Sequence, residues 1–198
     1  MEKYLKIKLL IPEEIWAAQT MCLPSIVAAI FASRPDARLE TVIAAIGVIF
    51  HLPFSYTLHM HRALVDDPVT RTKIFKFDVS FIHFHSFLTG YAWFLQLSWL
   101  ELFYHIFCIV NIVLSDPLTY SKSKNTIDIM CAIGVLKSSF GSFYRSKFLW
   151  LCAHVFWIIG FYVHNRKLLG PYSAAVFHII LVVPQYCIML ACQNHAII

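Results

Sequence analysis

Charged residues are scarce in this chain of 198 residues: Asp, Glu, Lys and Arg make up only 14% of it, against about 25% in a typical soluble domain. Hydrophobic residues account for 59% and the mean hydropathy is +0.68. A single core of this size cannot bury so much apolar surface, which argues against a soluble globular fold. The sequence therefore predicts an all-α, polytopic membrane protein.

Cysteine motifs are also missing. None of the six cysteines forms a C-x-x-C pair, and all lie inside apolar runs: Cys22, Cys108, Cys131, Cys152, Cys187 and Cys192. Buried free thiols fit this pattern better than a disulfide framework or a zinc knuckle does.

Signals for nucleic acid, for secretion and for several domains are absent as well. The net charge of +5 is modest, and no basic stripe with interleaved aromatics stands outside the apolar runs, so we expect contact with anionic lipid and no nucleic acid. Glu13 and Glu14 interrupt the place where a cleavable signal peptide would have its apolar region, which assigns targeting to the first membrane helix. Without repeats or linkers, residues 1–198 read as a single domain.

Long apolar runs dominate what is present. A helix that spans a membrane needs about 20 apolar residues. The chain offers seven such segments, at 15–33, 41–62, 77–96, 99–115, 126–143, 147–164 and 171–193. The apolar stretch 79–115 is too long for one helix and is divided near Ser98 and Glu101. The fifth segment is the weakest because Lys137 interrupts it.

The distribution of Lys and Arg between the loops predicts the orientation. With seven spans, one side carries eleven of them: Lys3, Lys6, Lys8, Arg62, Arg71, Lys73, Lys76, Lys122, Lys124, Arg166 and Lys167. The other side carries four: Arg34, Arg38, Arg145 and Lys147. We therefore expect an integral membrane protein with a cytosolic N-terminus.

Polar residues inside the apolar segments are candidates for function, because ionisable groups in a bilayer are costly. In "HLPFSYTLHMH", at the end of the second segment, His51, Ser55 and His59 recur every four residues and share one helical stripe. Pro53 lies within this stretch and removes one backbone donor, which predicts a kink.

Two further candidates lie at a similar depth. Asp78 opens the third predicted span, where a carboxylate also interacts favourably with the helix dipole, and His178 lies two turns into the seventh. In the predicted topology Ser55, His59, Asp78 and His178 all fall within about 10 Å of the cytosolic boundary. Imidazoles and a carboxylate at one depth are typical of a zinc site, whose bound water becomes a nucleophile. The competing interpretation is that these histidines are hydrogen-bond partners between helices.

The same residues resemble a known pattern. Ser55–His59 is similar to the S-x-x-x-H motif late in the second helix of the progestin and adipoQ receptor family, which includes the bacterial hemolysin III proteins. Residues 76–82, Lys-Phe-Asp-Val-Ser-Phe-Ile, resemble its K-L-D-x-S-x-I motif. Residues 173–178, Ser-Ala-Ala-Val-Phe-His, resemble its helix-seven motif S-H-Q-x-F-H. The family belongs to a superfamily of seven-helix membrane hydrolases with the alkaline ceramidases and Per1-like proteins.

This resemblance implies a zinc-dependent lipid hydrolase that cuts an acyl amide or ester of a membrane lipid. His59 and His178 would be metal ligands, and Asp78 and Ser55 would be catalytic. The family's first histidine in helix seven falls on Ala174, which cannot bind zinc, so the implied site is one imidazole short. That departure favours a second interpretation, a non-catalytic lipid-binding or receptor-like protein.

A third interpretation is unrelated to this family. His105 and His154 each lie in the middle of a predicted span. Paired axial histidines hold the haem of b-type membrane cytochromes, which would require these two to face each other at one depth. Packing between helices is the alternative role for both.

Overall fold

The computed structural model describes residues 11–65, 67–115 and 117–194, and these form helices without any strand. The elements are α1 (Glu13–Ala32), α2 (Leu39–Leu64), α3 (Pro68–Phe94), α4 (Trp99–Leu114), α5 (Pro117–Ser139), α6 (Gly141–Arg145), α7 (Lys147–Asn165), the 3₁₀ turn η1 (Gly170–Tyr172), α8 (Ser173–Ile180) and α9 (Val182–Gln193). The predicted all-α class is confirmed.

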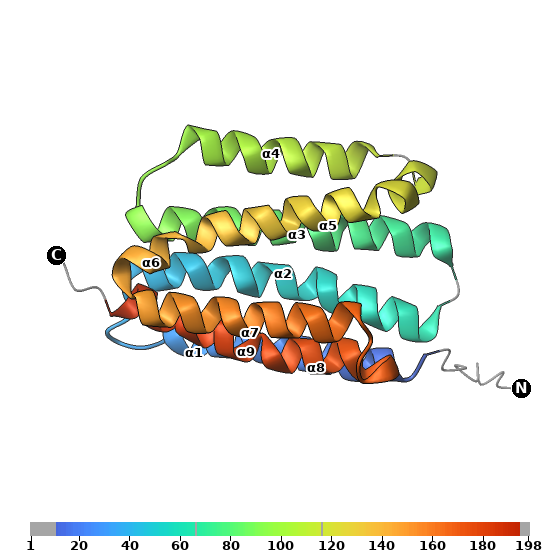
Figure 1. Cartoon of the computed structure of the whole chain (residues 1–198), viewed down its shortest axis with the longest axis horizontal. Helices are drawn as coiled ribbons and strands as arrows, with labels where there is room; N and C mark the ends of the chain where they lie inside the picture. The colour runs from blue at the N-terminus through green and yellow to red at the C-terminus, as the bar shows by residue number, and fades with distance from the viewer. Residues whose placement is uncertain (1–10, 66, 116, 195–198) are drawn as a thin grey trace, which may run out of the picture.

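The long helices run side by side along one axis (Figure 1). Helix α4 lies along one edge of the bundle, α3 and α5 come next, and α1, α7, α8 and α9 form the opposite side, with α2 packed between α1 and α3. The start of α1 and the end of α9 lie at opposite ends of the bundle.

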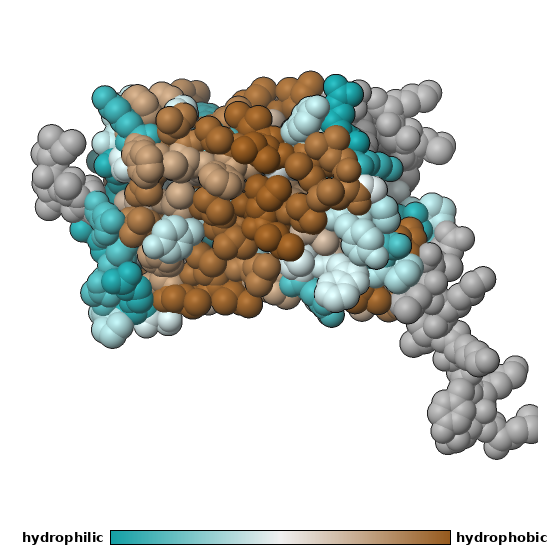
Figure 2. Space-filling model, turned by 60° about the horizontal axis from the view of Figure 1, so that its bottom comes forward, coloured by the Kyte–Doolittle hydropathy of each residue, from teal (hydrophilic) through white to brown (hydrophobic). Residues whose placement is uncertain are grey.

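Four segments are long and apolar enough to cross a membrane: Glu13–Ala32, Leu39–Leu64, Lys147–Asn165 and Gly170–Gln193. Figure 2 shows a broad hydrophobic band across the middle of one face, with hydrophilic residues at both ends. These features are consistent with an integral membrane protein. The count of seven spans stays a prediction, because α3, α4 and α5 are not among the four segments.

Helix α3 begins nine residues earlier than the sequence predicted, at Pro68 instead of residue 77. The Asp67 side chain accepts hydrogen bonds from the backbone N–H groups of Val69 (3.0 Å) and Thr70 (3.3 Å), and Pro68 occupies the first helical position, where its missing N–H does no harm. The expectation that Asp78 opens this helix is therefore wrong, because Asp78 lies about 15 Å beyond the start of α3. Its carboxylate needs another partner than the helix N-terminus.

The last apolar segment is broken into α8 and α9 at Leu181. Pro184 explains the break, since it lacks an N–H and its ring would clash with the carbonyl of Ile180 in a continuous helix. Helix α2, by contrast, runs through Pro53 from Leu39 to Leu64.

Small residues let the central helices approach closely. Ala28 of α1, Ala44 and Ala45 of α2, Ala92 of α3 and Ala191 of α9 are almost fully buried in one core cluster. Alanine at such positions is typical of helix contacts in membranes, where close packing replaces the hydrophobic driving force. The six cysteines are free thiols, and three of them are buried as expected, Cys108, Cys187 and Cys192, whereas the other three are partly exposed.

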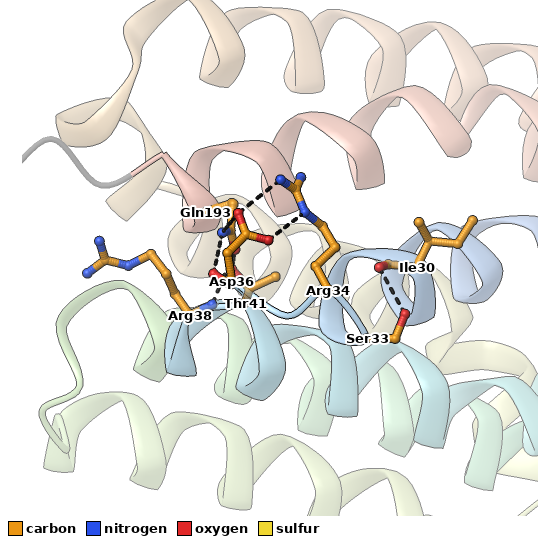
Figure 3. A network of polar contacts seen from close by, with 7 residues as sticks. All are labelled: Ile30, Ser33, Arg34, Asp36, Arg38, Thr41 and Gln193. Atoms are coloured by element: carbon orange, nitrogen blue, oxygen red, sulfur yellow. Dashed lines mark hydrogen bonds and ion pairs between the residues drawn. The ribbon is translucent and has the colours of Figure 1, made fainter.

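A polar network fastens the end of α9 to the loop between α1 and α2 (Figure 3). The Gln193 amide oxygen accepts from the Arg38 backbone N–H (3.2 Å) and the Thr41 hydroxyl (3.1 Å), and its amide nitrogen donates to the Asp36 carbonyl (2.7 Å). Arg34 binds the Asp36 carboxylate with two nitrogens, both at 3.1 Å. This Arg34 contact holds the pKa of Asp36 below its usual value. The network closes the end of the bundle opposite the start of α1.

Candidate functional site

Six polar side chains gather inside the bundle near the start of α1, and we call them the polar cluster. They come from four helices: Glu14 (α1), His51, Ser55 and His59 (α2), Asp78 (α3) and His178 (α8). Five are buried, and the Glu14 side chain keeps 18% of its surface exposed. The four-residue spacing along α2 places its three members on the face that meets α1 and α3.

Glu14 ties the first helix to the second. Its Oε2 accepts a hydrogen bond from His59 Nδ1, and its Oε1 lies 3.8 Å from Arg62 Nη1. The carboxylate therefore sits between a buried imidazole and a guanidinium at the end of α2. A buried carboxylate with two such partners avoids the large penalty of an unpaired charge.

His178 is oriented by backbone. Its Nδ1 lies 2.9 Å from the carbonyl oxygen of Ala17, and its ring centroid is 5.0 Å from that of His59, nearly perpendicular to it. A carbonyl only accepts hydrogen bonds, so His178 Nδ1 carries the hydrogen and Nε2 holds the lone pair. The same argument applies to His59, whose Nδ1 donates to the Glu14 carboxylate.

Asp78 finds its partners on α2. Its Oδ1 lies 2.9 Å from His51 Nε2, and Ser55 adds a further interaction with the carboxylate. His51 was the one member of the α2 stripe that matched no known motif, and the structure gives it this place. His51 and Ser55 thus both contact the Asp78 carboxylate from helix α2.

The structure brings together all four residues that the sequence singled out: Ser55, His59, Asp78 and His178. Both His59 and His178 interact electrostatically with the Asp78 carboxylate. Glu14 was missed, because its charge was considered only as an interruption of a signal peptide. Its position in the sequence could have revealed it. Glu14 lies at the start of the first apolar segment, and the predicted topology places it at the same depth in the membrane as His59.

The cluster does not form a three-ligand zinc site as it lies. Within the described residues, no group of three or more His, Cys, Asp or Glu side chains could hold a metal ion. Ala174, one turn before His178, contributes no ligand atom, and the Nδ1 atoms of both imidazoles are already bound to Glu14 and Ala17. Two imidazoles alone fall short of the three protein ligands of catalytic zinc.

A second group of polar side chains, the histidine–thiol cluster, lies between α3, α4 and α5. His83 Nδ1 and His105 Nδ1 are 3.2 Å apart, and the Cys131 thiol is 3.5 Å from His83 Nε2. Glu101 Oε1 lies 3.9 Å from His105 Nε2, and neither of these buried atoms has a hydrogen-bond partner among the residues that the structure describes. The two histidines are almost completely shielded, with exposures of 0% and 2%.

The environments of His105 and His154 differ. His105 contacts His83, whereas His154 Nε2 bonds the Ser139 hydroxyl at 2.9 Å and its Nδ1 donates to the Trp150 carbonyl at 2.7 Å. Each histidine thus has a partner of its own. This arrangement supports packing roles for both and gives no support to a shared haem.

Comparison with known proteins returned no matching family model, no similar curated protein and no similar solved structure.

Proposed function

We propose that this chain is a seven-span integral membrane protein with a cytosolic N-terminus that binds a membrane lipid at the polar cluster without hydrolysing it. The observation that carries the proposal is the pairing within the cluster: Glu14 binds His59, Asp78 binds His51, and Ala174 leaves the zinc site of the resembling family one ligand short. Both carboxylates of the cluster therefore have protein partners without a metal.

The chemistry of the bound lipid follows from the tautomers of the histidines. With hydrogen on both Nδ1 atoms, His59 and His178 present the lone pairs of Nε2. No hydrogen bond within the described part of the chain uses either Nε2. These acceptors, with the carboxylates nearby, suit a polar group that carries hydroxyl or amide N–H donors. The apolar helices around the cluster suit its acyl chains.

A zinc-dependent hydrolase of lipid amides or esters is the second candidate, and one observation favours it. Histidines that bind metals usually donate their other ring nitrogen to a carboxylate or a backbone carbonyl. His59 and His178 have this arrangement, with Glu14 and the Ala17 carbonyl. In that case Asp78 and Ser55 would be the neighbouring catalytic groups.

Metal and lipid analysis of one purified sample separates the two candidates. We expect a co-purifying lipid with hydroxyl or amide donors and no stoichiometric zinc. The variants His59→Ala and His178→Ala should lose the lipid, and His154→Ala, which removes a buried histidine elsewhere, should keep it. Zinc near one per chain that disappears in His59→Ala would overturn the lipid-binding proposal in favour of the hydrolase.

The topology has its own test. Glycosylation-acceptor tags added to each terminus should be modified at the C-terminus only. A modified N-terminal tag would invert the orientation and place the polar cluster on the exoplasmic side.

A further inference from the structure

A groove of about 510 Å³ opens at the end of the bundle opposite the polar cluster. Its walls are apolar and come from Phe94 at the end of α3, Ile133 and Leu136 of α5, Phe140 after it, and Tyr144 of α6. The volume falls within the range of about 300–1,000 Å³ that is typical of ligand sites. A second hollow, beside His154, measures only about 30 Å³.

The floor of the groove is held rigidly. Gly141, at the start of α6, packs so tightly on Trp93 that a Cβ atom would lie 2.3 Å from its Cγ. The Trp93 indole is 2% exposed and its Nε1 donates to the Ser138 carbonyl at 2.7 Å. This packing places the break between α5 and α6 against α3, beside the groove.

One cation lines the groove. Lys137 is exposed, in the last turn of α5, and its Nζ lies 5.5 Å from the centre of the Tyr104 ring. It makes no ion pair within the part of the chain that the structure describes. Arg145 at the same end differs, because it bonds the Trp93 carbonyl and lies 3.8 Å from Glu40. Lys137 is thus the cation of the groove lining that has no carboxylate partner among the described residues.

We propose that this groove binds one anionic phospholipid of the surrounding membrane, with an acyl chain along the apolar walls and the phosphate paired with Lys137. The apolar lining and the unpaired ammonium match the two parts of such a lipid, and a zwitterionic lipid would bring its own cation to the same place. Non-selective filling by bulk lipid would show no preference for the charge of the headgroup. A measured preference for anionic over zwitterionic lipid therefore distinguishes the proposed site from such filling.

Native mass spectrometry of the full chain in detergent tests it, with phosphatidylglycerol and phosphatidylcholine of identical acyl chains supplied in equal amounts. Wild type should retain the anionic lipid preferentially, and Lys137→Gln should reduce that preference about fivefold, the contribution of one lysine near a lipid surface. Lys147→Gln is the matched control, because its Nζ also lies over a ring, 5.6 Å from that of Phe143, but outside the groove. It should leave the preference unchanged.

A second variant tests the apolar part. Leu136→Trp places an indole in the groove and should reduce the retention of either lipid, with an unchanged melting temperature as evidence that the bundle is intact. Equal retention of the two lipids by wild type, or an equal loss of preference in Lys147→Gln, would overturn the proposal. So would a Lys137→Gln protein whose preference for the anionic lipid equals that of wild type.

Discussion

The polar cluster and the histidine–thiol cluster share helix α3 and are both built on histidines, but they satisfy those histidines differently. In the polar cluster His51 and His59 each bond a carboxylate, and His178 bonds a backbone carbonyl. In the histidine–thiol cluster His83 and His105 bond each other. The carboxylate nearest to this pair, Glu101, lies 3.9 Å from His105 Nε2, beyond hydrogen-bonding distance.

The difference is whether a buried carboxylate depends on the histidine. A buried carboxylate that loses the imidazole donating to it is left as an uncompensated charge. Two imidazoles bonded to each other lose one hydrogen bond when the pair is broken. Buried histidines can therefore differ widely in energetic weight, and the polar cluster is the better candidate for binding chemistry.

The largest effect is expected from His51→Leu. It leaves the buried Asp78 carboxylate without the imidazole 2.9 Å away, which should lower the free energy of unfolding by about 3–5 kcal/mol. Thermal or denaturant unfolding in detergent measures it. The double variant His51→Leu/Asp78→Leu removes the carboxylate together with its partner and should recover most of the loss. If the double variant is no better than the single one, the pair is not the source of the effect.

The second-largest effect on stability is expected from an added metal-binding side chain. Ala174→His places an imidazole one turn before His178 and supplies the third ligand that the polar cluster lacks. Zinc content should rise toward one per chain, and zinc at 100 times its dissociation constant should stabilise the variant by about 2.7 kcal/mol. Removal of zinc by a chelator should abolish the gain. Adding His59→Ala to this variant should prevent zinc binding, and a variant that still binds would place the metal elsewhere.

A smaller loss is expected in the histidine–thiol cluster. His105→Phe breaks the bond to His83 but fills a similar volume, and it also removes the buried Nε2 that has no partner. The free energy of unfolding should fall by about 1 kcal/mol, the net worth of a hydrogen bond. The same unfolding measurement applies. A loss as large as that of His51→Leu would erase the contrast between the two clusters.

The sequence predicted the all-α class and the break after the third segment correctly, because these depend on local composition. Ser98 caps α4, its side chain accepting from the Glu101 N–H, where the division was expected. The apolar run placed the start of α3 at residue 77, which is wrong. Asp67 and Pro68 form a recognisable helix start, but they lie before the apolar run begins.

Partners across helices were harder to predict. The four-residue spacing put His51, Ser55 and His59 on one stripe, but spacing along one helix does not say which residue of another helix meets it. Glu14 pairs with His59 across 45 positions of sequence. Such a pair depends on how α1 packs against α2. Small residues such as Ala44 and Ala45 allow the two helices to approach closely, but they do not determine which residues of α1 and α2 lie opposite each other.

The smallest effect is expected at Asp67, outside both clusters, where α3 begins. Hydrogen bonds from Thr70 and from the N–H groups of Thr70 and Val69 hold the pKa of Asp67 below its usual value of 3.8. A carboxylate whose pKa is lowered by folding stabilises the folded state above pH 3.8, and that contribution disappears as the pH falls through the lowered value. Asp67→Asn keeps a capping side chain that does not titrate. The melting temperature of wild type relative to Asp67→Asn should therefore be constant above about pH 5 and fall below 3.8. A difference between the two proteins that does not change with pH would remove Asp67 as the titrating group.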